Sequence, residues 1–203
     1  MRSCTFREHP PRWRVPGRWS ASAGLRRLLL VVLLVPALTG CGGEGEAGGR
    51  QFRSVAAGDP APAFAAATLD GDTLSLAALQ GEAVLLNIWA TWCLPCREEM
   101  PGLQRLHEEL GEQGLRVVGV SIDSRGASRD VRDFLASHGI SFTILHDPEE
   151  RVTRAFRTTG VPETFLIDRQ GRIVRRWIGL FDPTSEDTRS SVREALAAGG
   201  GSA

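Results

Sequence analysis

Lysine is absent from this sequence: all 24 of its basic residues are arginine. The arginines are scattered rather than arranged in a stripe, so they do not indicate a phosphate-binding surface. Their balance with acidic residues is uneven, because residues 1–40 hold seven arginines against one acid, whereas residues 41–203 hold 17 arginines against 23 acids. A main body that is net acidic argues against nucleic acid as a partner.

The apolar segment near the N-terminus is too short to span a membrane. Residues 28–38 (LLLVVLLVPAL) form a run of eleven, against the roughly 20 that a spanning helix needs. Arg26 and Arg27 stand before the run, and a secretory signal has the same order of a basic region and a short apolar one. A twin-arginine signal and a buried core helix are the two alternatives.

Cysteine is scarce, with four residues in the whole chain. Leu38-Thr39-Gly40-Cys41 closes the apolar run and resembles a bacterial lipobox, in which the cysteine is lipidated and becomes the mature N-terminus. We therefore expect a lipoprotein signal peptide over residues 1–40 and a lipid on Cys41. The protein would be exported and anchored to the cell membrane, facing the periplasm or extracytoplasmic side. Cys4 would leave with the signal, so two cysteines remain.

The chain after the signal divides into a tether and one domain. Residues 42–58 contain six glycines and one large apolar residue, Phe52, so residues 41–58 are expected to be a lipidated, flexible tether. No second linker and no internal repeat follow, which predicts a single domain over residues 59–198 and a flexible tail over 199–203. A hydrophobic content of 42% is enough for a packed core.

Apolar runs and turn signals predict the strands of this domain. Asp70-Gly71 is a hairpin turn signal, and the nearly continuous apolar run Ala83–Trp89 is typical of a strand buried on both faces. The expected strands cover residues 64–69, 73–76, 83–89, 115–122, 141–145, 164–168 and 172–178.

Helices are expected between and after the strands, over residues 93–112, 128–138 and 148–156, with a last one ending near Ala198. Pro101 should kink or split the first helix. Ser128 is expected to cap the second helix, and Thr184 or Ser185 the last. The order of elements predicts an α/β fold with a central mixed sheet, helices on both faces and an N-terminal β-hairpin extension.

The pair Cys93 and Cys96 stands between a buried strand and the start of a helix, which favours redox chemistry. The first sulfur would face unpaired backbone N–H groups and the positive end of the helix dipole, and both favour the thiolate. The second lies one turn further in and can resolve a mixed disulfide. A zinc site would need two more ligands, and the histidines are spread over different elements: His107, His138 and His146. We therefore expect no metal and no cofactor.

Two segments carry a family resemblance. Residues 87–101 (NIWATWCLPCREEMP) and 160–168 (GVPETFLID) resemble the two signatures of the exported, membrane-tethered TlpA/ResA/DsbE (CcmG) group of the thioredoxin superfamily. The resemblance covers about residues 59–198 and implies a thioredoxin-like fold and thiol–disulfide oxidoreductase activity. Many members of the group reduce the haem-binding cysteines of apocytochromes. It also implies that Cys93 is the nucleophile, Cys96 the resolving thiol and Pro162 a cis-proline facing the pair, with the Val161 backbone free to bind an extended substrate.

The buried thiol of Cys96 needs a proton acceptor. Many thioredoxins place an acid in the preceding strand, where this chain has Asn87. Glu99 lies three residues after Cys96 and so shares its helix face, whereas Glu98 does not. We therefore predict that Glu99 accepts the proton and that burial raises its pKa; the alternative is a solvated helix charge.

Other residues beside the two signatures receive separate predictions. Trp92 is expected to form an apolar lip that contacts substrate, while Trp89 packs in the core. Glu163 either contacts substrate or tunes Cys93, or it is a rim charge. Arg97 is expected on the surface.

Several functions are compatible with this pattern. Pro95 within the pair, and the lack of a histidine there, favour a reductant of exported protein disulfides, which must itself be re-reduced by a membrane electron donor. A copper-binding metallochaperone would use the two cysteines as soft ligands, and a thiol peroxidase is the third alternative. The protein is expected to act as a monomer.

Overall fold

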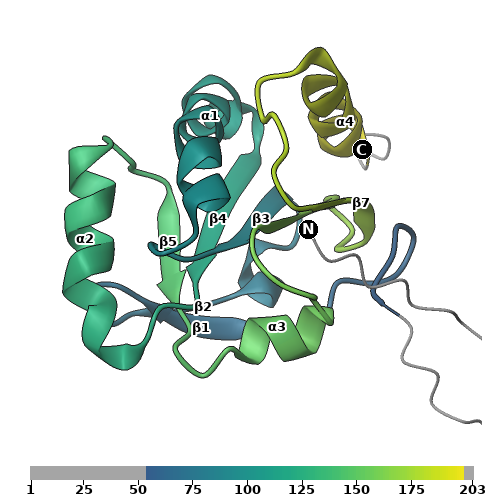
Figure 1. Cartoon of the computed structure of the whole chain (residues 1–203). Coiled ribbons are helices and arrows are strands. Elements are labelled where there is room, and N and C mark those ends of the chain that lie inside the picture. Colours follow the sequence, from purple (N-terminus) through teal and green to yellow (C-terminus); the bar gives the residue numbers. More distant parts are fainter. Residues whose placement is uncertain (1–53, 199–203) are drawn as a thin grey trace, which may run out of the picture. The chain divides into compact units, whose positions relative to one another are not determined.

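The computed structural model describes residues 54–198 (Figure 1). The predicted signal peptide, Cys41, most of the tether and the tail over 199–203 lie outside these residues. None of the helices within 54–198 has both the length and the apolar character required to cross a membrane.

Seven strands form one mixed sheet. They are β1 (Ala65–Thr68), β2 (Thr73–Ser75), β3 (Ala83–Trp89), β4 (Leu115–Ser121), β5 (Thr143–His146), β6 (Glu163–Ile167) and β7 (Ile173–Ile178), in the spatial order β2-β1-β5-β4-β3-β6-β7. β3, β4 and β5 run parallel, and the other neighbours pair antiparallel. All seven residues of β3 are buried, as the nearly continuous apolar run predicts, because β3 lies inside the sheet between β4 and β6 with both faces covered.

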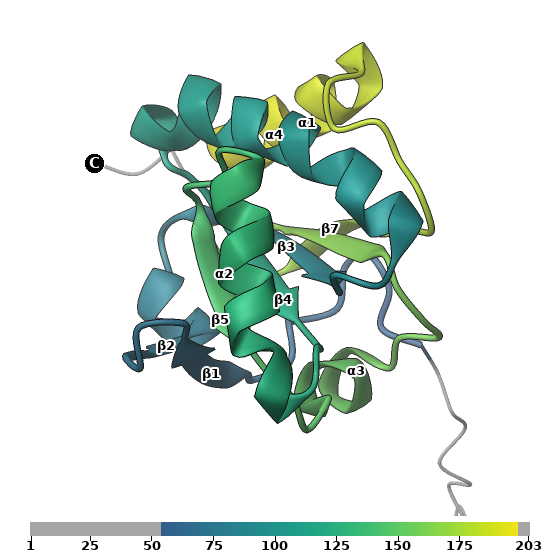
Figure 2. The ribbon, with the colours of Figure 1, turned by 60° about the vertical axis from the view of Figure 1, so that its left-hand side comes forward.

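Four α-helices cover the sheet: α1 (Leu94–Leu110), α2 (Ser128–Ser137), α3 (Arg151–Phe156) and α4 (Glu186–Ala197). Short 3₁₀ helices occupy Leu76–Leu79, Gly111–Gln113 and Arg125–Ala127. α1 joins β3 to β4 and α2 joins β4 to β5, and both steps move in one direction across the sheet. Because such crossovers are almost always right-handed, α1 and α2 lie on the same face. Figure 2 shows the two helices crossing this face.

The two faces of the sheet bury separate apolar clusters. One cluster combines side chains of α1, α2 and α4 with alternate residues of β3, among them Leu85 and Trp89. The other combines α3 with the remaining β3 residues, among them Leu86 and Ile88. Figure 1 accordingly shows α1 and α4 on one side of the sheet and α3 on the other. The predicted mixed sheet with helices on both faces and an N-terminal hairpin is confirmed.

The helices differ from the prediction at three positions. Ser128 is not a cap: Ala127 occupies the cap position without a side-chain hydrogen bond, because a 3₁₀ turn leads directly into α2. α3 begins at Arg151 rather than at residue 148, since the Asp147 carboxylate accepts from the Val152 amide at 2.7 Å and takes the capping role. Of the two effects predicted for Pro101, a kink or a split, the split does not occur: α1 continues through Pro101, which is exposed, so water can bond to the Arg97 carbonyl that proline leaves without a donor. Ser185 caps α4 as predicted.

The folded part begins before the predicted boundary at residue 59. The Gly58 amide donates to the Ile173 carbonyl at 2.7 Å, and the Ile173 amide donates to the Asp59 carbonyl at 2.9 Å. Val55 packs against the cluster on the α3 face. Residues 55–58, predicted to be part of the tether because of the glycines over 42–58, are therefore held beside β7.

Candidate active site

Cys93 and Cys96 form a disulfide at the start of α1. Cys93 is the N-cap residue, and its sulfur accepts from the Cys96 amide at 3.2 Å. This places Cys93 Sγ at the positive end of the helix dipole, which stabilises a thiolate in the reduced protein. Cys93 retains 5% of its surface and Cys96 none. The predicted difference in exposure between the two cysteines is present, whereas their roles as attacking and resolving thiols stay predictions.

A buried carboxylate fixes the loop before Cys93. Asp123, just after β4, accepts from both the amide and the hydroxyl of Thr91, with Thr91 Oγ1 to Asp123 Oδ1 at 2.6 Å. Ser121 Oγ also donates to Asp123 at 2.8 Å. Sequence reasoning missed this residue. Its position could have been predicted, because Asp123 follows β4 and Thr91 follows β3, and the carboxyl ends of neighbouring parallel strands meet at one edge of a sheet.

Exposed apolar side chains flank the cysteine pair. Trp92 is 67% exposed and Leu94 is 64% exposed, which fits the predicted apolar lip, and Trp89 is fully buried in the core as predicted. Ile178 and Leu180 are also exposed, and the Gly179 amide between them donates to the Pro162 carbonyl at 2.9 Å. Arg97 is on the surface as predicted, with its guanidinium over the Phe134 ring.

The Val161–Pro162 peptide bond is cis, as predicted. Ile88 of β3 pairs with Glu163 of β6, so continuing this register places Pro162 opposite Trp89, at the end of β3 that leads to Cys93. Val161 packs against the apolar cluster that contains both cysteines. The backbone contact of Val161 with a substrate stays a prediction.

Glu99 is buried on the sheet-facing side of α1, one helical turn after Cys96, so it is not a solvated charge. Its Oε1 accepts from the Phe181 amide at 2.9 Å, and its Oε2 accepts from Asn87 Nδ2 at 3.2 Å. Burial raises the pKa of Glu99 to about 7, although these two hydrogen bonds act in the opposite direction. The predicted rise in pKa is confirmed. A carboxyl that titrates near neutral pH is suited to exchange a proton with a thiol.

Asn87 links Glu99 to the next strand. Its Nδ2 also donates to Thr164 Oγ1 of β6 at 2.9 Å. Its Oδ1 is buried and has no hydrogen-bond partner among residues 54–198. The amide therefore has an unused acceptor beside Glu99. Thr164 was not identified from the sequence, because it comes from a strand 77 residues away.

Glu163 is not a rim charge, because it is fully buried. Its side chain shares a sheet face with Phe165 and Ile167, away from α1 and the cysteine pair. The carboxylate forms an ion pair with Arg176 of β7 and accepts from the Thr159 amide at 3.3 Å. Arg176 also donates to the Val55 carbonyl at 2.9 Å. In this arrangement Glu163 supports the loop before Pro162 rather than facing a substrate.

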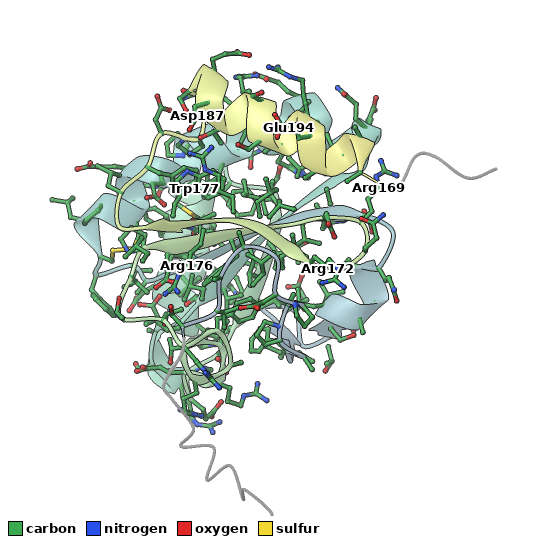
Figure 3. The ribbon with its side chains drawn as sticks, turned by 90° about the vertical axis from the view of Figure 1, so that its right-hand side faces the viewer. Arg169, Arg172, Arg176, Trp177, Asp187 and Glu194 are labelled. Carbon is green, nitrogen blue, oxygen red and sulfur yellow. A yellow bond between two sulfur atoms is a disulfide. The ribbon has the colours of Figure 1, made fainter. Side chains whose placement is uncertain are left out.

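Figure 3 shows Arg176 and Trp177 leaving β7 on opposite sides, with Trp177 directed toward α4. Trp177 stacks on Phe181, with ring centroids 4.9 Å apart, and packs against the cluster that contains the cysteines. Residues 54–198 contain no group of three or more His, Cys, Asp or Glu side chains placed to hold a metal ion.

Known proteins are similar to this chain in sequence and in fold. The AhpC/TSA family matches residues 57–176. The thiol-disulfide oxidoreductase ResA of Bacillus thuringiensis (strain Al Hakam) is 30% identical over 157 residues, which cover 75% of this chain and 88% of ResA. ResA of Bacillus subtilis (strain 168) is 32% identical over 122 residues, or 60% of this chain and 67% of that protein.

A crystal structure from Chlorobium tepidum, assigned as the thiol:disulfide interchange protein DsbE, has a TM-score of 0.65 and 32% identity, covering 70% of this chain and 99% of the other. The sheet order, the helix-capping cysteine pair and these similarities confirm the thioredoxin-like fold. The chain belongs to the AhpC/TSA family and is a thiol–disulfide oxidoreductase of the ResA/DsbE type.

Proposed function

We propose that the protein is a lipid-anchored dithiol reductant of exported protein disulfides, such as those of apocytochromes c during cytochrome c maturation. The observation that carries this proposal is the asymmetry of the pair: Cys93 caps α1 and keeps some exposed surface, while Cys96 is closed off behind it. The exposed apolar side chains of Trp92, Leu94 and Leu180 offer a surface for an unfolded polypeptide.

The reaction follows from the two positions. The Cys93 thiolate attacks one sulfur of a substrate disulfide, and the other substrate sulfur leaves as a thiolate. Cys96 then loses its proton to Glu99 and attacks Cys93 Sγ, which releases the second substrate thiolate and leaves the Cys93–Cys96 disulfide. Two electrons pass to the substrate. A membrane electron donor must return the pair to the dithiol form before the next cycle.

The reduction potential of the cysteine pair tests the direction of electron transfer. In dithiothreitol redox buffers, the detergent-purified full chain is expected to show a potential nearer the about −270 mV of thioredoxin than the about −120 mV of the oxidant DsbA. Its dithiol form should reduce a disulfide peptide with a Cys-x-x-Cys-His haem-attachment sequence. A potential near that of DsbA would contradict the proposal. Stoichiometric Cu(I) binding without peptide reduction would instead favour a metallochaperone.

The anchor is tested at Cys41. Mass spectrometry of the protein from native membranes is expected to find an acylated peptide that begins at Cys41. Cys41→Ser should abolish this lipid, on processed and unprocessed protein alike, while disulfide reduction through Cys93 and Cys96 continues. Cys4→Ser is the matched control and should change neither property. An unmodified Cys41 in the membrane fraction would contradict lipidation.

A further inference from the structure

We propose that the loop of residues 179–185, between β7 and α4, positions Glu99 for proton transfer, and that close contact between Gly102 and Pro183 sets the position of this loop. The inference rests on the proposed role of Glu99 in resolving the mixed disulfide. It assigns the loop and Gly102 as positioning elements that act through Glu99.

Glu99 is held by neutral donors from two different elements. Asn87 of β3 donates to one oxygen, and the Phe181 amide of the loop donates to the other. The titratable group on its own helix face is Cys96. The charged residues Glu98, Arg105 and Asp182 line a surface hollow beside the loop. The Phe181 amide is thus the contact through which the loop favours the charged form of the carboxylate.

The loop is fixed at both of its ends. Near β7, the Phe181 ring stacks on Trp177, and the Gly179 amide donates to the Pro162 carbonyl. Near α4, Thr188 Oγ1 of the helix donates to the Asp182 carbonyl at 2.9 Å, and within the loop the Asp182 carboxylate accepts from the amide and hydroxyl of Thr184 at 2.8 and 2.7 Å. These bonds define the loop's shape, and Arg189 of α4 pairs with Glu109 of α1 beyond the loop. The loop itself meets α1 in a third contact.

That third contact is Pro183 against Gly102 on α1. Pro183 is buried, and a Cβ added to Gly102 would lie 3.0 to 3.2 Å from three atoms of its ring. Glycine is a poor helix former, yet it stands in the middle of α1 where the loop touches the helix. Its missing side chain lets the loop approach closely enough for the Phe181 amide to reach Glu99.

Moving the loop outward has a defined electrostatic consequence. A Cβ at Gly102 requires the loop to give by a few tenths of an ångström, which is too little to admit water beside Glu99. This shift lengthens the bond from the Phe181 amide and so weakens a stabilising contact to the carboxylate. The pKa of Glu99 must therefore rise above about 7. Fewer molecules then carry the carboxylate at neutral pH, and the proton of Cys96 has a poorer acceptor.

Two changes test the two parts of the inference in the reduced full-length chain. An ester in place of the Leu180–Phe181 amide deletes the donor alone and should raise the pKa of Glu99 by about 1. Gly102→Ala should also raise the pKa of Glu99, by a smaller amount. Gly111→Ala is the matched control, because its Cβ would meet only His107 on the same helix, at 3.7 Å, and no loop atom. NMR titration of the Glu99 carboxyl measures all three.

The outcomes separate this inference from the proposed function. If the ester leaves the pKa unchanged, the loop does not position Glu99. If the ester raises it but Gly102→Ala behaves like Gly111→Ala, the Gly102–Pro183 contact does not set the loop. If both changes raise the pKa and the rate of mixed-disulfide resolution stays constant, the positioning is supported and the proton-acceptor role of Glu99 fails.

Discussion

Cys96→Ser is expected to stop the reaction at a mixed disulfide between Cys93 and the substrate, lowering turnover by at least about 10³-fold. Resolution would then depend on a free thiol, whereas an attack within one helical turn has a far higher effective concentration. The mixed disulfide should accumulate because Cys93 keeps its exposed edge and its place at the N-terminus of α1. Non-reducing gels and mass spectrometry of the trapped complex measure the result.

Cys93→Ser is the control for this prediction. It leaves only Cys96, which is fully buried and whose thiolate is disfavoured by apolar surroundings. It should trap little substrate. Equal trapping by the two variants would contradict the assignment of Cys93 as nucleophile and Cys96 as resolving thiol.

Glu99→Gln should slow the resolution of the mixed disulfide by at least about tenfold near neutral pH, because general-base assistance is typically worth ~10²–10⁴-fold. Asn87, the polar neighbour on β3, cannot accept the proton. In the unchanged protein the resolution rate should rise with pH through about 7 as Glu99 loses its proton. Stopped-flow measurement against pH should show that Glu99→Gln lacks this rise.

Glu98→Gln is the matched control, since Glu98 is the neighbouring carboxylate on the exposed side of α1. It should change the resolution rate little. The attack of Cys93 on substrate should also change less than the resolution step in Glu99→Gln. Identical behaviour of the two glutamine variants would show that Glu99 takes no part in proton transfer.

The same substitution has a second readout in stability. The pKa of Glu99 is raised from 4.5 to about 7 in the folded state, so the folded protein binds the proton more tightly than the unfolded chain. The stability that the protonated Glu99 contributes is fully present below about pH 4.5 and is lost as pH rises through 7. Above that pH, the buried carboxylate lowers the free energy of unfolding by about 3 kcal/mol. Denaturant unfolding should therefore show Glu99→Gln gaining stability relative to the unchanged protein between pH 4.5 and 8.5.

Local patterns in the sequence were sufficient to predict most strands and the cysteine pair. Ala83–Trp89 was predicted at both ends, because a strand covered on both faces is typically a nearly continuous apolar run. Glu99 was predicted from helical spacing to Cys96, which is also local. Ser128 was misassigned because serine alone does not distinguish a cap from a residue inside a continuing turn.

Contacts between distant segments could not be predicted in this way. The Phe181 amide that holds Glu99 comes from 82 residues along the chain, and a backbone donor carries no residue signature. Glu163 was assigned near the cysteines by its place after Pro162, but strand alternation turns its side chain to the other face, where Arg176 is the partner. Such pairings depend on register, which only the assembled sheet defines.

The attachment of residues 55–59 to the edge of the sheet has a mechanical consequence. Any pull on the chain upstream of Ser54 reaches the folded part first at the Val55 carbonyl, which Arg176 holds, and only then at the bonds between residues 58–59 and Ile173. The other partner of Arg176 is Glu163, the residue directly after Pro162. The first point to bear load from the N-terminal side and one support of the cis-proline loop are therefore the same guanidinium group.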